Sequence, residues 1–185
     1  MSNPQNKSDI VEHLTTIQHN LTDDIARMSD AQFCNGTVES WSAKDYLKHL
    51  LLSTKLMTKG MELPAEALQS RFDLSGRASR SYAEVIQVYK KRLDEGIRAE
   101  DFDRVVPMGY RFPEGITDER AYLVQSWDET NQRLINATQH WSEGELDSLQ
   151  MPHAAIGRVT LREMLFFTIY HNTLHWHDMQ HAAGL

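Results

Sequence analysis

The chain has 185 residues, of which 41% are hydrophobic and 24% are charged, and its formal net charge at pH 7 is −7. This composition is typical of an ordinary globular protein and argues against a disordered chain, and the length predicts a single domain over residues 1–185. The acidic charge argues against a nucleic-acid partner, because neutralising phosphates requires clustered Lys and Arg.

Two further features limit where the protein acts and how it could bind metal. No apolar run approaches the roughly 18 residues of a spanning helix, and no signal-peptide pattern precedes the first amphipathic stretch. We therefore expect a cytoplasmic protein without a membrane partner. Cys34 is the single cysteine, so it can form neither an intramolecular disulfide nor a thiolate zinc site by itself. Any metal site would depend on histidine and oxygen ligands.

The first predicted helix covers residues 10–28, where apolar residues recur at steps of three and four. Ser8 or Asp9 is available as its N-cap, and it is expected to end near Ser29.

The second helix is expected to begin at about Ala43, because Ser42 and Asp45 form a variant capping box. Its apolar stripe consists of Tyr46, Leu47, Leu50, Leu51, Thr54 and Met57.

The region between the second and third helices is less regular. Residues 81–97 predict an additional helix in this crossover, with apolar and aromatic residues on one side. Residues 98–117 contain two Pro-Xaa-Gly groups among aromatic residues and predict an ordered loop. A loop of this length often covers a site.

The third helix is expected over residues 118–141, and the fourth is expected to begin after Thr160, where Glu163 completes a capping box. Asn131 interrupts the apolar stripe of the third helix; it could hold a water near a metal ligand or fix a helix contact, and we favour the contact. No strand alternation is convincing. The sequence therefore predicts an all-α four-helix bundle with an additional helix in the crossover between helices two and three.

Two histidine pairs with i, i+4 spacing lie on the fourth predicted helix, and this spacing lets two imidazoles reach one divalent ion. The apolar face of the helix includes His175 and borders His171. His177 and His181 point to the opposite side, where we expect solvent or a subunit contact.

His49 is the candidate for a third ligand, because it borders the buried stripe of the second helix. The remaining histidines are weaker candidates: His13, His19, His140 and His153. From spacing and helix face alone, a three-histidine metal site and ordinary packed histidines are equally good interpretations.

Two carboxylates could assist such a site. Asp178 lies one turn beyond His175 and could orient an imidazole or face water, and we favour the solvated interpretation. Asp24, at the edge of the first helix's stripe, is an equally open candidate for a general base.

The stretch from Ser40 to Leu50, SWSAKDYLKHL, resembles the second-helix signature of the DinB-like (YfiT-like) superfamily, in which a tryptophan precedes the helix and its histidine binds metal. The stretch from Pro152 to Glu163 resembles the family's proline-to-glycine loop and Thr-Leu helix start. The His171-Xaa-Xaa-Xaa-His175 pair follows in the family's order, so the similarity covers essentially the whole bundle.

This resemblance implies a four-helix bundle that holds one divalent metal on His49, His171 and His175, with open positions for water or substrate, and often a homodimer. Family members with assigned activities include thiol S-transferases that use bacillithiol-like or mycothiol-like thiols, and a thiol-dependent maleylpyruvate isomerase. The insertion at residues 81–97 and the histidine-rich tail depart from the family pattern and leave the substrate open.

Two classes of function agree with these features. The first is a metal-dependent enzyme in which the ion activates water or a thiol, acting on a small-molecule substrate as a low-molecular-weight thiol S-transferase or a hydrolase. The second is a non-catalytic bundle that binds a small ligand or forms a dimeric interaction module, with the metal structural or absent. Zinc and nickel are the first expectations for the ion, with iron and manganese as alternatives.

Overall fold

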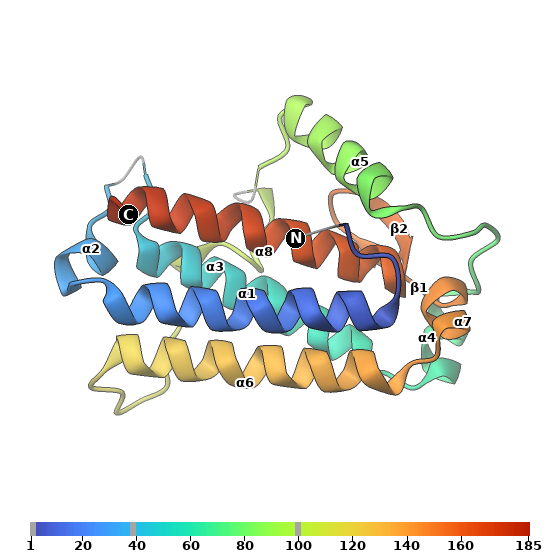
Figure 1. The fold of residues 1–185 in the computed structure, drawn as a ribbon, viewed down its shortest axis with the longest axis horizontal. Helices are drawn as coiled ribbons and strands as arrows, with labels where there is room; N and C mark the ends of the chain where they lie inside the picture. The colour runs from blue at the N-terminus through green and yellow to red at the C-terminus, as the bar shows by residue number, and fades with distance from the viewer. Residues whose placement is uncertain (1–2, 38–39, 99–100) are drawn as a thin grey trace.

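The computed structural model describes residues 3–37, 40–98 and 101–185. In this part of the chain, four long helices run side by side (Figure 1): α1 (Lys7–Arg27), α3 (Ala43–Met61), α6 (Glu119–His140) and α8 (Leu161–Ala183). Both α1 and α3 pack against α6 and against α8. The predicted all-α bundle is confirmed.

The additional helix in the crossover is α5 (Tyr82–Asp94), which lies against α8 outside the bundle (Figure 1). Val85 and Tyr89 form its buried side, and the Tyr89 ring meets the Phe167 ring of α8 edge-on, with centroids 4.9 Å apart. The crossover also contains α4 (Ala65–Phe72), which begins directly after Pro64. The helix predicted over 81–97 is therefore confirmed, whereas α4 was not predicted.

The helix starts depend on capping boxes. In a capping box the N-cap side chain accepts a hydrogen bond from the backbone N–H three residues later, and the side chain of that later residue accepts one from the N-cap backbone N–H. Ser42 with Asp45 begins α3, and Thr160 with Glu163 begins α8, both as predicted. The predicted cap of α1 was wrong. Asn6 is the N-cap and Asp9 is its partner three residues later, so the helix begins earlier than the first apolar residue of its stripe indicates.

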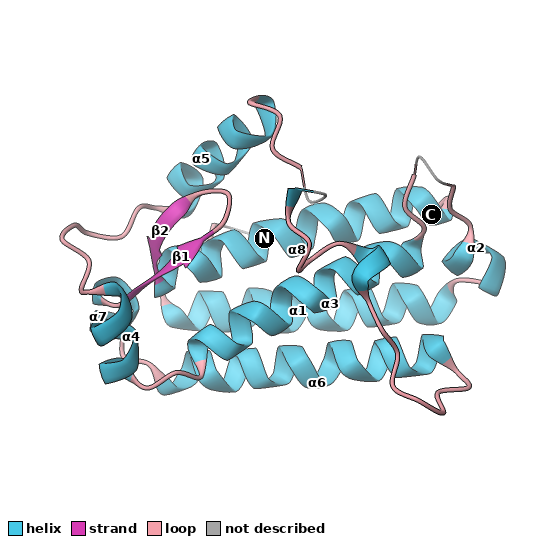
Figure 2. Ribbon diagram, turned by 180° about the vertical axis from the view of Figure 1, so that it is seen from behind, coloured by secondary structure: helices cyan, strands magenta, loops and turns pink. Residues whose placement is uncertain are grey.

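Several short elements join the long helices and were not predicted. Two are single-turn or two-turn helices, α2 (Asp30–Cys34) and α7 (Glu143–Ser148). The expectation of no strands was also wrong, because β1 (Gln150–His153) and β2 (Gly157–Thr160) form an antiparallel hairpin before α8 (Figure 2). Four residues in each strand are too few for a visible alternation of apolar and polar residues.

Glu163 fixes the start of α8 to the segment that precedes α5. Its carboxylate is fully buried and accepts hydrogen bonds from the Arg77 and Arg80 guanidinium groups, from the Arg80 backbone N–H at 2.6 Å and from the Thr160 backbone N–H at 3.2 Å. Burial by itself would raise the pKa of this carboxyl, but the hydrogen bonds from the two arginines lower it to about 2. The side chain is therefore ionised at neutral pH.

The described core also contains buried polar side chains, and a buried polar group needs a hydrogen-bond partner. Asn131 is buried in α6 and donates to the Trp127 carbonyl of the same helix at 2.9 Å, so it makes a contact within α6. Trp127 is itself fully buried.

None of the helices within the described ranges combines the length and the apolar character that a membrane crossing requires.

Candidate metal centre

Three histidines converge in the space between α3 and α8. His49 comes from the middle of α3, and His171 and His175 come from successive turns of α8. One ring nitrogen from each of the three lies within 4.8 Å of the others. His49 and His171 are buried, and the His175 side chain is 15% exposed. The structure therefore brings together the three residues that the sequence selected as candidate ligands.

Each of these rings has an oxygen acceptor at Nδ1. The Val105 carbonyl lies 2.8 Å from His49 Nδ1, and the Asp178 carboxylate lies 2.9 Å from His175 Nδ1. The Asn172 amide oxygen lies 3.4 Å from His171 Nδ1. When a neutral imidazole donates its single N–H from Nδ1, the lone pair is on Nε2. The surroundings therefore favour the tautomer in which Nε2 is free to bind a metal.

The spacing of the ring nitrogens fits a divalent ion. His49 Nε2 and His171 Nε2 are 3.0 Å apart. Two nitrogens bound tetrahedrally to zinc at about 2.0–2.1 Å would lie about 3.3 Å apart. With both Nδ1 atoms donating, two lone pairs would face each other, and a cation between them removes this repulsion. Without a cation, one ring must adopt the other tautomer in order to donate.

Burial keeps the His49 and His171 rings neutral. Burial, together with the nearby His175, lowers the pKa of His49 to about 4, although the Val105 carbonyl acts in the opposite direction. The pKa of the fully enclosed His171 falls well below its ordinary value for the same reason, with His175 and His49 adding to the effect. Neutral imidazoles are the form that binds metal, so neither ring has to lose a proton at pH 7.

The cluster lies in the wall of a pocket of about 940 Å³. Side chains of α3, α5 and α8, the hairpin, and the loop residues from Phe102 to Val105 line it. Part of the predicted ordered loop at 98–117 therefore lies at the site, namely residue 98 and residues 102–105. Residues 99–100 lie outside the described ranges. Its Pro107–Gly109 segment forms a 3₁₀ turn, η2. The pocket is large enough for an organic ligand of moderate size.

The family model of the DinB superfamily matches residues 13–179. The chain belongs to the DinB superfamily. The match extends from the first turns of α1 into the last turns of α8, so it includes all three histidines of the cluster. No curated protein matches the chain. Membership and geometry together support a site at which this DinB-superfamily protein could hold a metal ion.

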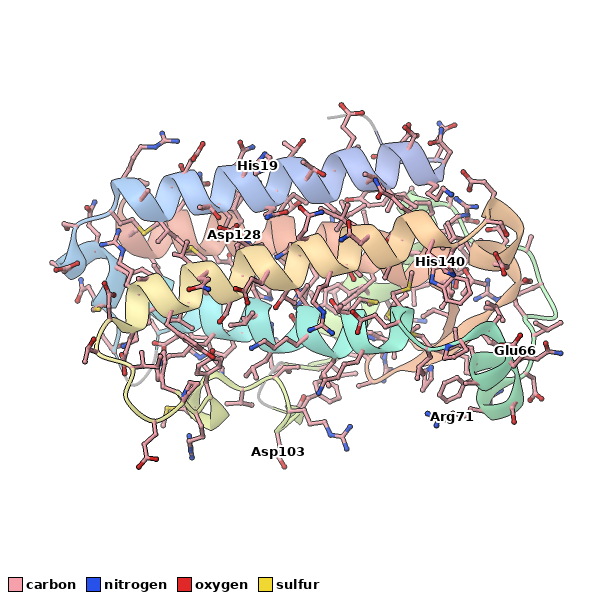
Figure 3. All side chains as sticks on the ribbon, turned by 90° about the horizontal axis from the view of Figure 1, so that it is seen from below. His19, Glu66, Arg71, Asp103, Asp128 and His140 are labelled. Atoms are coloured by element: carbon pink, nitrogen blue, oxygen red, sulfur yellow. The ribbon has the colours of Figure 1, made fainter. Side chains whose placement is uncertain are left out.

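The other histidines on α8 lie outside the site, as predicted. His177 and His181 are exposed, and the His177 ring stacks on Trp176. His19 and His140 are exposed and lie on the outer side of the DinB-superfamily bundle (Figure 3). His13 is buried, but its Nδ1 bonds the Asp9 carbonyl within α1. None of these five lines the pocket within the described ranges.

The preferred interpretation of Asp178 was wrong. Its carboxylate orients His175 instead of facing only water, because an i, i+3 spacing on α8 brings the two side chains within 2.9 Å. Asp24 is not a general base at this site. It accepts hydrogen bonds from Trp176 Nε1 at 2.8 Å and from Gln180 Nε2 at 2.7 Å, so it joins α1 to α8 away from the pocket lining.

His153 is a pocket residue that the sequence interpretation underrated. It is the last residue of β1, and its ring packs on Phe167 with centroids 4.1 Å apart. Burial lowers its pKa to about 4, so its ring is neutral at pH 7. In the sequence, only its position directly before the short Ala154–Ile156 turn could have indicated a role for His153. The hairpin that brings it close to α8 was not predicted.

Replacing Asp178 is expected to weaken metal binding without removing it. An Asp178→Ala change leaves the His175 Nδ1–H without its acceptor, and loss of such a partner typically costs about 10–100-fold in metal affinity. The affinity for zinc can be measured by competition with a chromophoric chelator. Asp94→Ala, which removes an exposed carboxylate from α5, serves as the matched control. Equal affinity in the Asp178 and Asp94 variants would contradict the orienting role.

Proposed function

We propose that the protein is a metal-dependent enzyme in which His49, His171 and His175 bind one divalent ion beside the pocket. The convergence of three histidine ring nitrogens on a large, mostly apolar pocket carries the proposal. A divalent ion held only by imidazoles keeps its full charge and lowers the pKa of a coordinated water or thiol toward neutrality. Three protein ligands are typical of catalytic sites, whereas structural zinc sites fill four positions.

The chain's own residues supply positioning and exclude bulk water. Asp178 and the Val105 carbonyl hold two of the rings in place through their Nδ1 atoms. Phe102 and Val105 line the same pocket from the loop, and Phe167 packs against the His171 ring with centroids 5.2 Å apart. These contacts fix the ring positions before a substrate arrives, which is the arrangement that favours catalysis.

Transfer of a low-molecular-weight thiol is the preferred reaction, ahead of hydrolysis. Asp103 is the one carboxylate among the described pocket residues, and its exposed side chain points away from the bundle (Figure 3). The site therefore offers no well-placed general base. A thiol with a pKa of about 8.5 needs less help to lose its proton than water does. Zinc and nickel remain the preferred ions, because imidazole suits both.

Metal removal tests the proposal directly. Tag-free protein would be stripped with a chelator, reloaded with zinc or nickel, and incubated with a thiol and 1-chloro-2,4-dinitrobenzene. The thiols would be cysteine, glutathione and bacillithiol. We expect thiol consumption by the reloaded protein to exceed that of the stripped protein by at least about tenfold.

An ester substrate without thiol would measure hydrolysis in parallel. Faster ester cleavage without thiol consumption would favour a hydrolase. Equal rates with and without metal in both assays would contradict an enzyme and favour a non-catalytic ligand-binding bundle.

A further inference from the structure

His153 lies in the same pocket as the three-histidine cluster but takes no part in it. Its ring contacts Phe167, and Phe167 in turn stacks against His171. It belongs to the hairpin, whereas the cluster belongs to α3 and α8. The pocket wall therefore carries a fourth imidazole, beyond those proposed to bind metal.

The hydrogen bonds of His153 fix which of its nitrogens can donate. Its Nδ1 accepts from the backbone N–H of Ala155 at 3.2 Å and from that of Ile156 at 3.3 Å. A nitrogen that accepts cannot carry the proton of a neutral ring, so that proton is on Nε2. Within the described ranges, no protein acceptor lies within hydrogen-bonding distance of this Nε2–H.

Two other polar atoms at the pocket also lack protein partners. Asn172 Nδ2 and Thr54 Oγ1 are buried without a hydrogen bond to any described residue, and both side chains belong to residues that line the pocket. Buried donors of this kind are rare, because each costs free energy unless a ligand or water binds it. The Asn172 amide is oriented, since its oxygen faces His171 Nδ1 and its Nδ2 points elsewhere. Both atoms are enclosed by protein, so of these three groups His153 Nε2–H is the donor that the described pocket wall can offer to a ligand.

The charges around the pocket favour an anion. Its described lining includes two arginines, Arg98 and Arg104, and one carboxylate residue, Asp103. The Arg98 guanidinium donates to the Leu93 and Ile97 carbonyls. Arg104 forms no ion pair with any described residue. The rest of the wall is mainly apolar: Met57, Leu93, Phe102, Met151, Met164 and Phe167.

We propose that His153 Nε2–H binds the carboxylate of an otherwise apolar substrate. The apolar body of the substrate lies against the remaining wall. This inference rests on the proposed function, because it assigns the substrate class of the pocket beside the metal. His153 is a binding residue in this assignment, and the proposed metal ligands remain the three clustered histidines.

Two substitutions separate this role from a purely structural one. The amide oxygen of Asn at position 153 can take the place of His153 Nδ1 and keep the turn, but it offers no donor at the Nε2 position. The amide nitrogen of Gln can take the place of Nε2 and keep the donor, but it loses the turn acceptor. A pocket role predicts that His153→Gln retains binding and His153→Asn loses it. A role in the turn alone predicts that His153→Asn is more stable than His153→Gln and that the two variants bind equally well.

The probe is phenylacetate, titrated calorimetrically into zinc-loaded full-length protein, with phenylacetamide as the uncharged comparison. We expect His153→Asn to bind phenylacetate about tenfold more weakly than wild type, the effect of one hydrogen bond to a charged group. His153→Gln should stay within about threefold of wild type. The exposed His177→Gln is the matched control and should bind like wild type. Thermal unfolding shows whether each variant is folded.

Zinc content, measured by elemental analysis, keeps this inference distinguishable from the proposed function. Undiminished phenylacetate binding in His153→Asn would overturn the assignment, as would equal binding of phenylacetamide and phenylacetate by wild type. Absence of phenylacetate binding at full zinc occupancy would also overturn it. Protein that takes up no zinc but binds phenylacetate through His153 would instead contradict the proposed function and support the carboxylate subsite.

Discussion

Replacing any one of His49, His171 and His175 by Ala is expected to abolish stoichiometric zinc or nickel binding. Each ring contributes one of three nitrogens within 4.8 Å of one another, so a variant retains two ligands at most. Loss of the hydrogen-bond partner of a metal ligand typically lowers the metal affinity roughly 10–100-fold. Loss of the ligand itself should lower the affinity further. Elemental analysis of tag-free protein after dialysis measures the effect.

The control for these variants comes from the same helix. His177→Ala and His181→Ala remove an i, i+4 pair with the same spacing, but both side chains are exposed and outside the pocket. These variants should keep the metal content of wild type. Full stoichiometry in all three cluster variants would eliminate the proposed site, and loss of metal in the two control variants would place it on the wrong side of α8.

Replacing Glu163 by Ala is expected to lower the free energy of unfolding by about 3 kcal/mol. The change leaves Arg77 and Arg80 without their shared carboxylate. It also removes the acceptor of the Thr160 backbone N–H at the start of α8 and of the Arg80 backbone N–H in the segment before α5. Denaturant unfolding measures the loss. Glu163→Gln keeps an acceptor for the capping box but not the charge, so its stability should lie between those of wild type and Glu163→Ala.

The same carboxylate predicts a pH dependence. The pKa of the Glu163 carboxyl is about 2 in the folded protein, whereas its ordinary value is 4.5. The carboxylate therefore binds a proton more readily when the chain is unfolded. Its stabilisation, about 3 kcal/mol, is complete above pH 4.5 and is lost as the pH falls toward 2. Wild type and Glu163→Gln should therefore converge in stability over this range.

A matched control for Glu163 lies at the start of α5. Glu84 occupies the same position in a capping box with Ser81, but it is exposed. Glu84→Gln should change stability much less than Glu163→Gln. Equal losses in the two variants would show that the cap, and not the buried ion pairs, accounts for the effect.

The long helices and the three clustered histidines could be predicted because their signals repeat over several turns. The apolar stripe of α8 separates His171 and His175 from His177 and His181, and a second stripe places His49 inward on α3. The cap of α1 was harder, because Asn6, Ser8 and Asp9 are all suitable residues within four positions. A stripe fixes the face of a helix, but it does not fix its first residue.

The parts of the site that were not predicted depend on contacts between distant segments. His153 reaches the pocket only because the hairpin places it beside Phe167, and four-residue strands give no periodic signal. Asp178 lies at the border between two faces of α8, where side-chain rotamers decide whether it meets His175 or water. The hydrogen bond that the Val105 carbonyl accepts from His49 Nδ1 joins a loop to a helix 56 residues away, and no local pattern indicates it.

The 122-residue separation between His49 and His171 also links metal binding to folding. An unfolded chain can bring His171 and His175 together within one turn of helix, but His49 joins them only after α3 and α8 have packed. An ion held by all three rings therefore selects the folded chain by mass action. At a free concentration one hundred times its Kd, it would add about 2.7 kcal/mol to the free energy of unfolding.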